Sequence, residues 1–199
     1  VREGVDTPAS ELDQSIFDQA QQAEQAKHDK LMASVNTGKG DQSLNPYQIG
    51  QEMGEVMNAA STVVKTGPGL EKCLAKLDEL RERFSRVELG DGAMWTNQSL
   101  SYARSVGDML ILAEAIAKAG LLREESRGSH YRTDFPERDD ERFWKTSVAK
   151  FNEETGKSDI EFIEVKAGLV KLRPRNYGKV DSGTNKEKIP PKQVAQANA

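Results

Sequence analysis

The chain has 199 residues, of which 36% are hydrophobic and 30% are charged, and its formal net charge is −4. The length suits one ordinary domain with extensions, and the low apolar content indicates that part of the chain lies outside a packed core. A net negative charge gives no electrostatic reason to expect a nucleic-acid partner.

Cysteine content and hydropathy bear on the compartment. Cys73 is the single cysteine, which excludes an internal disulfide and fits a reducing environment. No signal peptide and no run of about 18 apolar residues occurs, so the sequence predicts no membrane-spanning helix. Because the chain begins with Val1 rather than methionine, we expect it to be part of a longer polypeptide.

Residues 1–43 are expected to form an entry linker and one polar helix. Thr7-Pro8 marks the helix start, because proline is tolerated in a first turn, and the helical stretch covers residues 9–35. Its few apolar residues are scattered: Ile16, Phe17, Leu31, Met32 and Val35. A helix with so little to bury is exposed, or it leans on protein outside this chain. Residues 36–43 predict a flexible loop.

Residues 44–122 predict an antiparallel three-helix bundle of the spectrin-repeat kind. The first helix, over about residues 46–64, begins with the cap residue Asn45 and with Pro46 in its first turn. Gly67-Pro68-Gly69 ends it and opens a helix over about residues 69–88, in which Glu79–Arg83 and Glu82–Arg86 are solvent-side i,i+4 pairs. Apolar spacing assigns these buried faces: Ile49, Met53, Val56, Ala60 and Val63, then Leu70, Leu74, Leu77, Leu80, Phe84 and Val87.

The helix predicted over about residues 97–119 is apolar on two sides. One stripe holds Leu100, Ala103, Val106, Leu110, Ala113 and Ala117, and the other holds Met109, Leu112 and Ile116. So wide an apolar arc packs on more than one neighbour, which places this helix at the centre of the bundle. Gly120 is expected to follow its last turn as the C′ residue.

Residues 123–173 predict a charged loop followed by a small β-hairpin. Residues 125–140 are too charged for a core, and residues 139–145 could form one or two helical turns. Residues 145–166 alternate about a turn at 153–158, as a hairpin does. Residues 174–199 have almost nothing to bury and are expected to be a disordered tail. The predicted fold class is therefore mainly α.

The charged loop carries a resemblance to a known family. It reads Glu125-Ser126-Arg127-Gly128-Ser129-His130-Tyr131-Arg132, then Asp134-Phe135-Pro136-Glu137-Arg138-Asp139-Asp140. This resembles the C-terminal signature of succinate dehydrogenase and fumarate reductase flavoprotein subunits, Glu-Ser-Arg-Gly-Ala-His followed by Asp-(Phe/Tyr)-Pro-x-Arg-x-Asp. The agreement covers roughly residues 44–180 and is most similar to the Bacillus-like branch. Ser129 replaces the usual alanine.

The resemblance implies a parent protein that interconverts succinate and fumarate with FAD, in the tricarboxylic acid cycle and electron transport. It implies three partners: the flavin-binding domain of the same subunit, an iron–sulfur subunit and a membrane anchor. The complex would lie peripherally on the cytoplasmic face of the bacterial inner membrane. A homodimer of the isolated piece is a further expectation.

The family's catalytic and flavin-binding motifs lie upstream of the region that this chain resembles. We therefore expect no catalytic residue, no metal ligand and no cofactor in the chain itself. Thr37-Gly38-Lys39-Gly40 and Gly67-Pro68-Gly69 lack the spacing of a dinucleotide-binding loop.

Four loop residues are candidate contacts to the flavin domain: Arg127, Gly128, His130 and Arg132. Two interpretations stay open for them, and for Arg138. Arginines can bind carboxylates and backbone carbonyls, which would hold the loop on the bundle and the neighbouring domain. Alternatively, one or two of these residues lie close enough to the flavin domain to affect cofactor capture, with Gly128 permitting a close backbone approach.

Other catalytic and metal interpretations are weaker. Ser129, His130 and Asp134 invite a catalytic triad, but adjacent side chains point apart and no strand–turn–helix elbow frames the serine. Asp139-Asp140-Glu141 is more typical of a solvated helix N-terminus than of a cation site.

The remaining metal and aromatic candidates favour ordinary structural roles. His28, His130 and Cys73 are too far apart in sequence to suggest a metal site. Trp95 and Trp144 are expected to be packing residues.

Two alternative functions remain: a free-standing helical interaction module, and the C-terminal domain of a related flavin oxidase such as aspartate oxidase. The coding sequence upstream of Val1 discriminates them. A dinucleotide-binding glycine motif and a flavin-attaching histidine there would identify a flavoprotein parent, whereas a start codon would favour the module.

Overall fold

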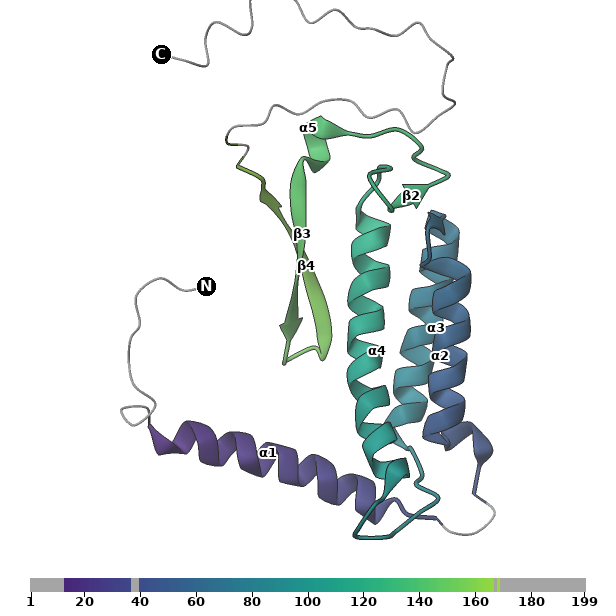
Figure 1. Cartoon of the computed structure of the whole chain (residues 1–199), viewed down its shortest axis with the longest axis vertical. Helices are drawn as coiled ribbons and strands as arrows, with labels where there is room; N and C mark the ends of the chain where they lie inside the picture. The colour runs from purple at the N-terminus through teal and green to yellow at the C-terminus, as the bar shows by residue number, and fades with distance from the viewer. Residues whose placement is uncertain (1–12, 37–39, 167, 169–199) are drawn as a thin grey trace, which may run out of the picture. The chain divides into compact units, whose positions relative to one another are not determined.

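The computed structural model describes residues 13–36, 40–166 and 168, and these form a mainly helical fold with a strand pair near its C-terminal end (Figure 1). The predicted fold class is confirmed. The expected tail at 174–199, the entry linker up to about residue 7 and the helix start expected at Thr7-Pro8 lie outside the described residues. All elements below belong to one compact unit, Val1–Val165.

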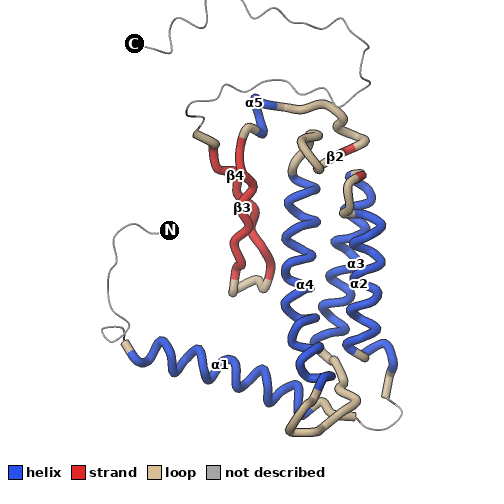
Figure 2. The backbone as a smooth tube through the Cα atoms, in the orientation of Figure 1, coloured by secondary structure: helices blue, strands red, loops and turns tan. Residues whose placement is uncertain are grey.

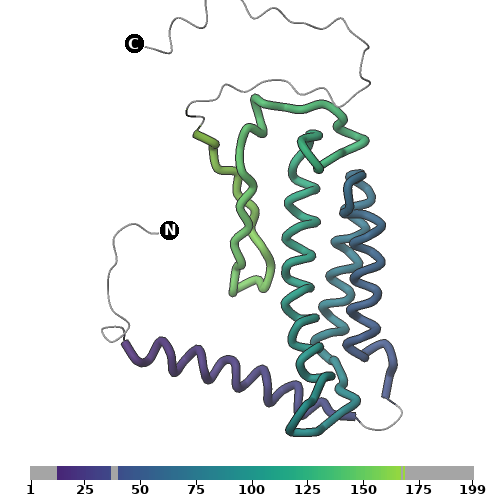
Figure 3. The backbone as a smooth tube through the Cα atoms, in the orientation of Figure 1, coloured from purple at the N-terminus to yellow at the C-terminus, as the bar shows by residue number. Residues whose placement is uncertain are grey.

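Three long helices carry the core: α2 (Pro46–Ala60), α3 (Gly67–Ser85) and α4 (Gln98–Leu122). The chain passes along them in alternating directions, so that consecutive helices lie side by side (Figure 3). Each begins with a cap: Asn45, Thr66 and Asn97 accept hydrogen bonds from amides of their first turns. Their facing stripes form the core: Ile49, Met53, Ala60, Leu70, Cys73, Leu77, Leu80, Val106, Leu110, Ala113 and Ala117.

The helix predicted over 46–64 is too long. Helix α2 ends at Ala60, and Val63, assigned above to its buried face, is 59% exposed. The cause is a long-range strand pair, because β1 (Val64–Lys65) runs parallel to β2 (Tyr131–Arg132). Helix α3 opens at Gly67-Pro68-Gly69 as expected, and its first residue is Gly67 rather than about residue 69.

Helix α4 continues past the predicted stop. Gly120 is a buried residue inside the helix rather than its C′ residue, and Arg123 is the C-cap. The first apolar stripe of α4 faces the core, whereas in the second stripe Leu112 is 61% and Ile116 55% exposed. Besides α2 and α3, α4 contacts the last strand.

The predicted hairpin is present. Strands β3 (Lys145–Asn152) and β4 (Lys157–Glu164) pair antiparallel, with Lys145 opposite Glu164 (Figure 2). The turn contains Gly156 at φ +63°, a conformation that suits glycine. The buried carboxylate of Glu114 on α4 accepts a 2.9 Å hydrogen bond from the Ser158 amide, which fixes β4 on the bundle.

The polar N-terminal helix is α1 (Gln14–Ala33), and none of its residues is buried. Its C-terminal end is attached by hydrogen bonds from Asn36 N to Leu89 O, 2.8 Å, and from Leu89 N to Ser34 O, 3.2 Å. Farther along, Glu24 pairs with Arg104 of α4 at 2.6 Å. Within the described residues, no helix combines the length and hydropathy that crossing a membrane requires.

Candidate functional site

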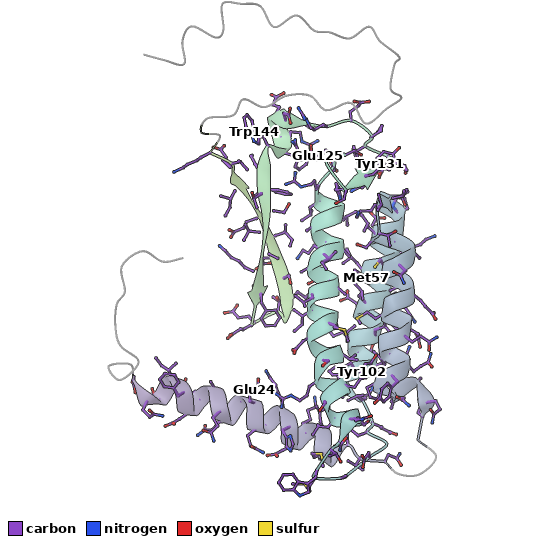
Figure 4. The ribbon with its side chains drawn as sticks, in the orientation of Figure 1. Glu24, Met57, Tyr102, Glu125, Tyr131 and Trp144 are labelled. Carbon is purple, nitrogen blue, oxygen red and sulfur yellow. The ribbon has the colours of Figure 1, made fainter. Side chains whose placement is uncertain are left out.

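The charged loop lies at the C-terminal end of α4, between the bundle and the hairpin, where Figure 4 labels Glu125, Tyr131 and Trp144. Its centre is Glu125, whose side chain is fully buried. The Glu125 carboxylate accepts hydrogen bonds from Arg123 Nη1 at 2.5 Å, Arg127 Nε at 2.8 Å and the Asp139 amide at 2.9 Å. A buried carboxylate is tolerated only with such complete pairing.

Arg123 joins this centre to the hairpin. Its guanidinium lies 5.5 Å from the centre of the Phe143 ring and 5.4 Å from that of Phe162. It also donates to the carbonyls of Phe143, at 3.0 Å, and Lys145, at 2.5 Å. Sequence reasoning did not single out Arg123, because its partners on the hairpin side lie 20 or more residues away.

The acidic run opens a short helix and also binds arginines. Asp139 caps α5 (Asp140–Phe143) by accepting a hydrogen bond from the Arg142 amide at 2.9 Å, as expected for a helix N-terminus. Asp140 is not only a solvated residue of the first turn, because it pairs with Arg127 at 2.7 Å and Arg138 at 2.6 Å. Among the residues that the structure describes, no group of three or more His, Cys, Asp or Glu side chains could hold a metal ion.

Arg132, in strand β2, binds both the end of α4 and Asp134, and its side chain is only 2% exposed. Its Nη1 donates to the Gly120 and Leu121 carbonyls, 2.9 Å each, which satisfies backbone acceptors at the end of α4. Its Nε and Nη2 form a two-pronged pair with the Asp134 carboxylate, at 2.8 and 2.7 Å.

Asp134 extends this arrangement to α3, because its Oδ2 accepts a hydrogen bond from the Gly67 amide at 2.9 Å. The Arg132 guanidinium, more than any other neighbour, holds the pKa of Asp134 far below its usual range. The carboxylate therefore stays charged and occupies the amide end of α3. That end is the Gly67-Pro68-Gly69 turn, so the position that a phosphate would take at this helix is filled from within the chain.

A tight turn presents Gly128 and Ser129 to solvent. The backbones of Arg127 and His130 exchange hydrogen bonds of 2.8 and 3.0 Å, and Gly128 adopts φ +62°. A side chain at Gly128 would meet no atom within 4 Å, so glycine is favoured by the backbone angle rather than by crowding. Of the four candidate contacts to the flavin domain, Gly128 is the exposed one.

His130 is partly buried, and its Nε2 lies 3.1 Å from the Arg123 carbonyl oxygen. Burial is the main reason that the pKa of His130 lies below its ordinary value, so the neutral ring is favoured. The polar partner of His130 is thus a backbone carbonyl, and that of Asp134 is Arg132. The triad interpretation gains no support from this geometry.

Two further expectations are wrong. Trp95 is 85% exposed rather than packed, since it lies in a surface loop beside Thr96, which has a positive φ of 55°. Arg83 is not a solvent-side partner of Glu79 alone. Its side chain is 14% exposed and binds both oxygens of Glu52, at 2.7 and 2.9 Å, and the Ser43 carbonyl.

Comparisons with known proteins agree with this architecture. Residues 50–177 match the family described as fumarate reductase flavoprotein C-term. The chain is 34% identical over 176 residues to the succinate dehydrogenase flavoprotein subunit of Bacillus subtilis, covering 88% of this chain and 29% of that protein. It is 34% identical over 168 residues to the fumarate reductase flavoprotein subunit of Escherichia coli, covering 80% and 27%.

Solved structures show the same likeness. A mutant of E. coli quinol fumarate reductase superposes with a TM-score of 0.71 at 32% identity, covering 82% of this chain and 27% of that one. An adenylylsulfate reductase from Archaeoglobus fulgidus shares the fold at 20% identity and a TM-score of 0.61, covering 82% and 26%.

A helical core, an arginine-bound loop and a terminal hairpin, together with these matches, define a C-terminal domain of the flavoprotein class. The chain belongs to the fumarate reductase flavoprotein C-terminal family. It spans less than a third of the length of the curated relatives that it matches.

Proposed function

We propose that this chain is the C-terminal part of a subunit that interconverts succinate and fumarate with FAD, and that it braces the flavin-binding part. The supporting observation is the family match over residues 50–177, which includes the loop motif. In the structure the arginines of that motif bind carboxylates and carbonyls of the same domain. A role in holding shape fits this arrangement better than a role in chemistry.

FAD is assigned to the part of the subunit that the chain does not cover, where it would supply the hydride acceptor or donor. The described residues fit a dinucleotide poorly, because Asp134 fills the amide end of the glycine-containing turn. The chain's own contribution is to keep a rigid surface beside the flavin-binding part. By itself it is expected to be inactive and free of cofactor.

Arg127, Gly128, His130 and Arg132 remain proposed contributors to the contact with the flavin-binding part. Arg127, His130 and Arg132 act through the shape of the loop, since their polar atoms bind within the domain. Gly128 offers the exposed tip. The exposed stripe with Leu112 and Ile116 on α4 is a second proposed contact.

The remaining partners are an iron–sulfur subunit and a membrane anchor, which together would hold the complex on the cytoplasmic face of the bacterial inner membrane. The relatives support the general class of complex, since they are flavoprotein subunits of succinate dehydrogenase and fumarate reductase. A homodimer of the isolated chain is a further proposal.

The test compares the whole subunit with the 199-residue chain. The subunit should hold FAD and reduce an artificial electron acceptor with succinate, and the chain alone should do neither. In the subunit, Arg127→Ala should lower thermal stability while FAD is incorporated normally. A chain that binds FAD or turns over a dicarboxylate unaided would overturn the proposal, as would a subunit without flavin.

A further inference from the structure

A groove of about 780 Å³ lies where α1 crosses the lower part of the bundle. Its walls come from the C-terminal half of α1, the end of α3 and one side of α4, and the hairpin turn reaches it at Gly156. Its floor is apolar, with Leu31, Phe84 and Ile111 each only partly buried. Gly107 leaves room in this floor, since a side chain there would approach the Phe84 ring to 3.0 Å.

Charge distinguishes this groove from the rest of the molecule. Five cations line it against three acids, although the whole chain carries a net charge of −4. The cations are Lys27, Lys30, Arg81, Arg86 and Arg104. Glu24 is bound by Lys27 and Arg104, and no ion pair joins Lys30 or Arg81 to another side chain in the described part of the chain. The other two lining acids, Glu88 and Asp108, likewise have no ion-pair partner among the described residues. With five cations against three acids, the groove carries a net positive charge around an apolar floor.

Helix α1 is poorly packed within the described part of the chain. It has 20 residues and buries none of them, and Ile16 and Phe17 are 55% and 45% exposed. A polar helix of this length gains little stability from propensity alone, so it needs a packed neighbour. The bundle supplies contact only near its C-terminal end and at Glu24 (Figure 4). The residues of α1 that line the groove, Glu24, Lys27, Lys30, Leu31 and Ala33, all stay at least partly exposed.

We propose that this groove receives an acidic segment of the same subunit, from the part that the chain does not cover. The inference rests on the proposed function. The matched relatives are more than three times as long as their matched regions, so most of the subunit lies outside this chain. A segment that alternates carboxylates with apolar side chains would neutralise Lys30 and Arg81, fill the floor and bury one side of α1. Segments close in sequence are usually close in space, which favours the subunit's own chain as the source.

Carbodiimide coupling on the intact, purified subunit tests this, because it joins a lysine amine to a carboxylate only where the two are in contact. Lys30 should couple to a carboxylate outside the 199 residues of this chain, as read by mass spectrometry of the digest. The Lys27–Glu24 pair, 2.6 Å apart, should couple in every sample and reports that the reaction worked.

Two charge reversals on α3 supply the matched comparison. Arg81 lines the groove. The Arg81→Glu variant should show about tenfold less coupling of Lys30 to the acidic segment, since the new carboxylate repels that segment. Lys72 is exposed and lies about two and a half turns from Arg81, on the opposite side of α3. The Lys72→Glu variant should therefore leave the coupling of Lys30 unchanged.

Several outcomes would overturn the proposal. Lys30 coupling only within residues 1–199, to a second copy, or to a separate subunit would each exclude the assigned occupant. So would a Lys30 that stays uncoupled while Lys27 reacts, or equal effects of the two reversals. A subunit that lacks FAD would instead refute the proposed function, and the coupling map would still decide the occupant of the groove.

Discussion

At the scale of single residues, Glu125 decides the shape of the loop. Its buried carboxylate is shared by Arg123, Arg127 and the Asp139 amide. Glu125→Gln should lower the free energy of unfolding by about 3 kcal/mol, because both guanidinium groups then lose their buried counter-charge. Urea denaturation of the 199-residue chain measures this.

The control for Glu125 is Glu161→Gln on β4. Glu161 pairs with Lys150 at 2.8 Å, but both side chains are at least half exposed, and such pairs contribute little. Its replacement should leave the urea midpoint nearly unchanged. Equal losses in the two variants would contradict the central role of Glu125.

The residue scale also shows what the sequence could predict. The motif located the loop, and of the two interpretations left open for its arginines, binding to carboxylates and carbonyls describes the contacts that Arg127 and Arg132 make within the domain. Arg123 and the role of Asp134 at Gly67 were missed. The contacts of Arg123 with Phe143 and of Asp134 with Gly67 join residues that are 20 and 67 positions apart, and no local pattern marks such a pair.

At the scale of elements, Glu114 attaches the hairpin to α4 through the Ser158 amide. Glu114→Leu should leave that buried amide without an acceptor, at a cost of about 1–3 kcal/mol. Hydrogen exchange at Ser158 should rise in this variant. Glu114→Gln keeps a carbonyl oxygen in place and should retain most of the protection, whereas equal exchange in both variants would refute the attachment.

The connection between α2 and α3 depends on pH. The hydrogen bond from Arg83, opposed by desolvation and aided by Lys76, lowers the pKa of Glu52 from 4.5 to about 2. A depressed carboxyl pKa stabilises the fold above the unfolded value, and this stability is lost as the pH falls through the folded one. Thermal stability should therefore decline between about pH 4.5 and 2.

Glu52→Gln should flatten the pH dependence contributed by this carboxyl, because glutamine does not titrate. The measurement is the melting temperature of both proteins at several pH values in that window. Parallel curves for the two proteins would show that Glu52 does not link α2 to α3 in the way proposed.

Element boundaries show where local patterns fail. Helical periodicity predicted α2, α3 and α4, but it extended α2 to residue 64 and ended α4 before Gly120. Helix α2 ends early because Val64 and Lys65 pair with Tyr131 and Arg132. Helix α4 continues because Arg132 binds the carbonyls of Gly120 and Leu121. Both causes lie in a loop that follows α4 in the sequence.

At the scale of the whole molecule, Leu112 and Ile116 leave an apolar stripe on α4 exposed. We expect the isolated chain to bind a hydrophobic dye and to self-associate, since contiguous apolar surface favours both. Leu112→Ser combined with Ile116→Ser should reduce dye fluorescence several-fold and shift gel filtration toward the monomer. Because neither side chain is buried, thermal stability should change little.

The matched control changes apolar residues elsewhere on the surface. Phe151 and Ile163 are each 51% exposed on the hairpin. Serine at both positions should leave dye binding close to that of the parent chain. A monomer that binds no dye, or an equal loss in the hairpin variant, would contradict the assignment of the stripe on α4.

The parallel pair of β1 and β2 has a consequence for synthesis on the ribosome. The hydrogen bond from the Gly67 amide to Asp134 lies next to this strand pair. Its two residues are 67 positions apart, and α3 and α4 lie between them in the sequence. Contacts so distant in sequence form late. The first helices of the nascent chain therefore cannot make these contacts until the loop after α4 has left the ribosome. A polypeptide terminated after α4 would contain every core residue of the three helices. It would still lack Asp134, which binds the Gly67 amide at the beginning of α3, and Arg132, which binds the last carbonyls of α4.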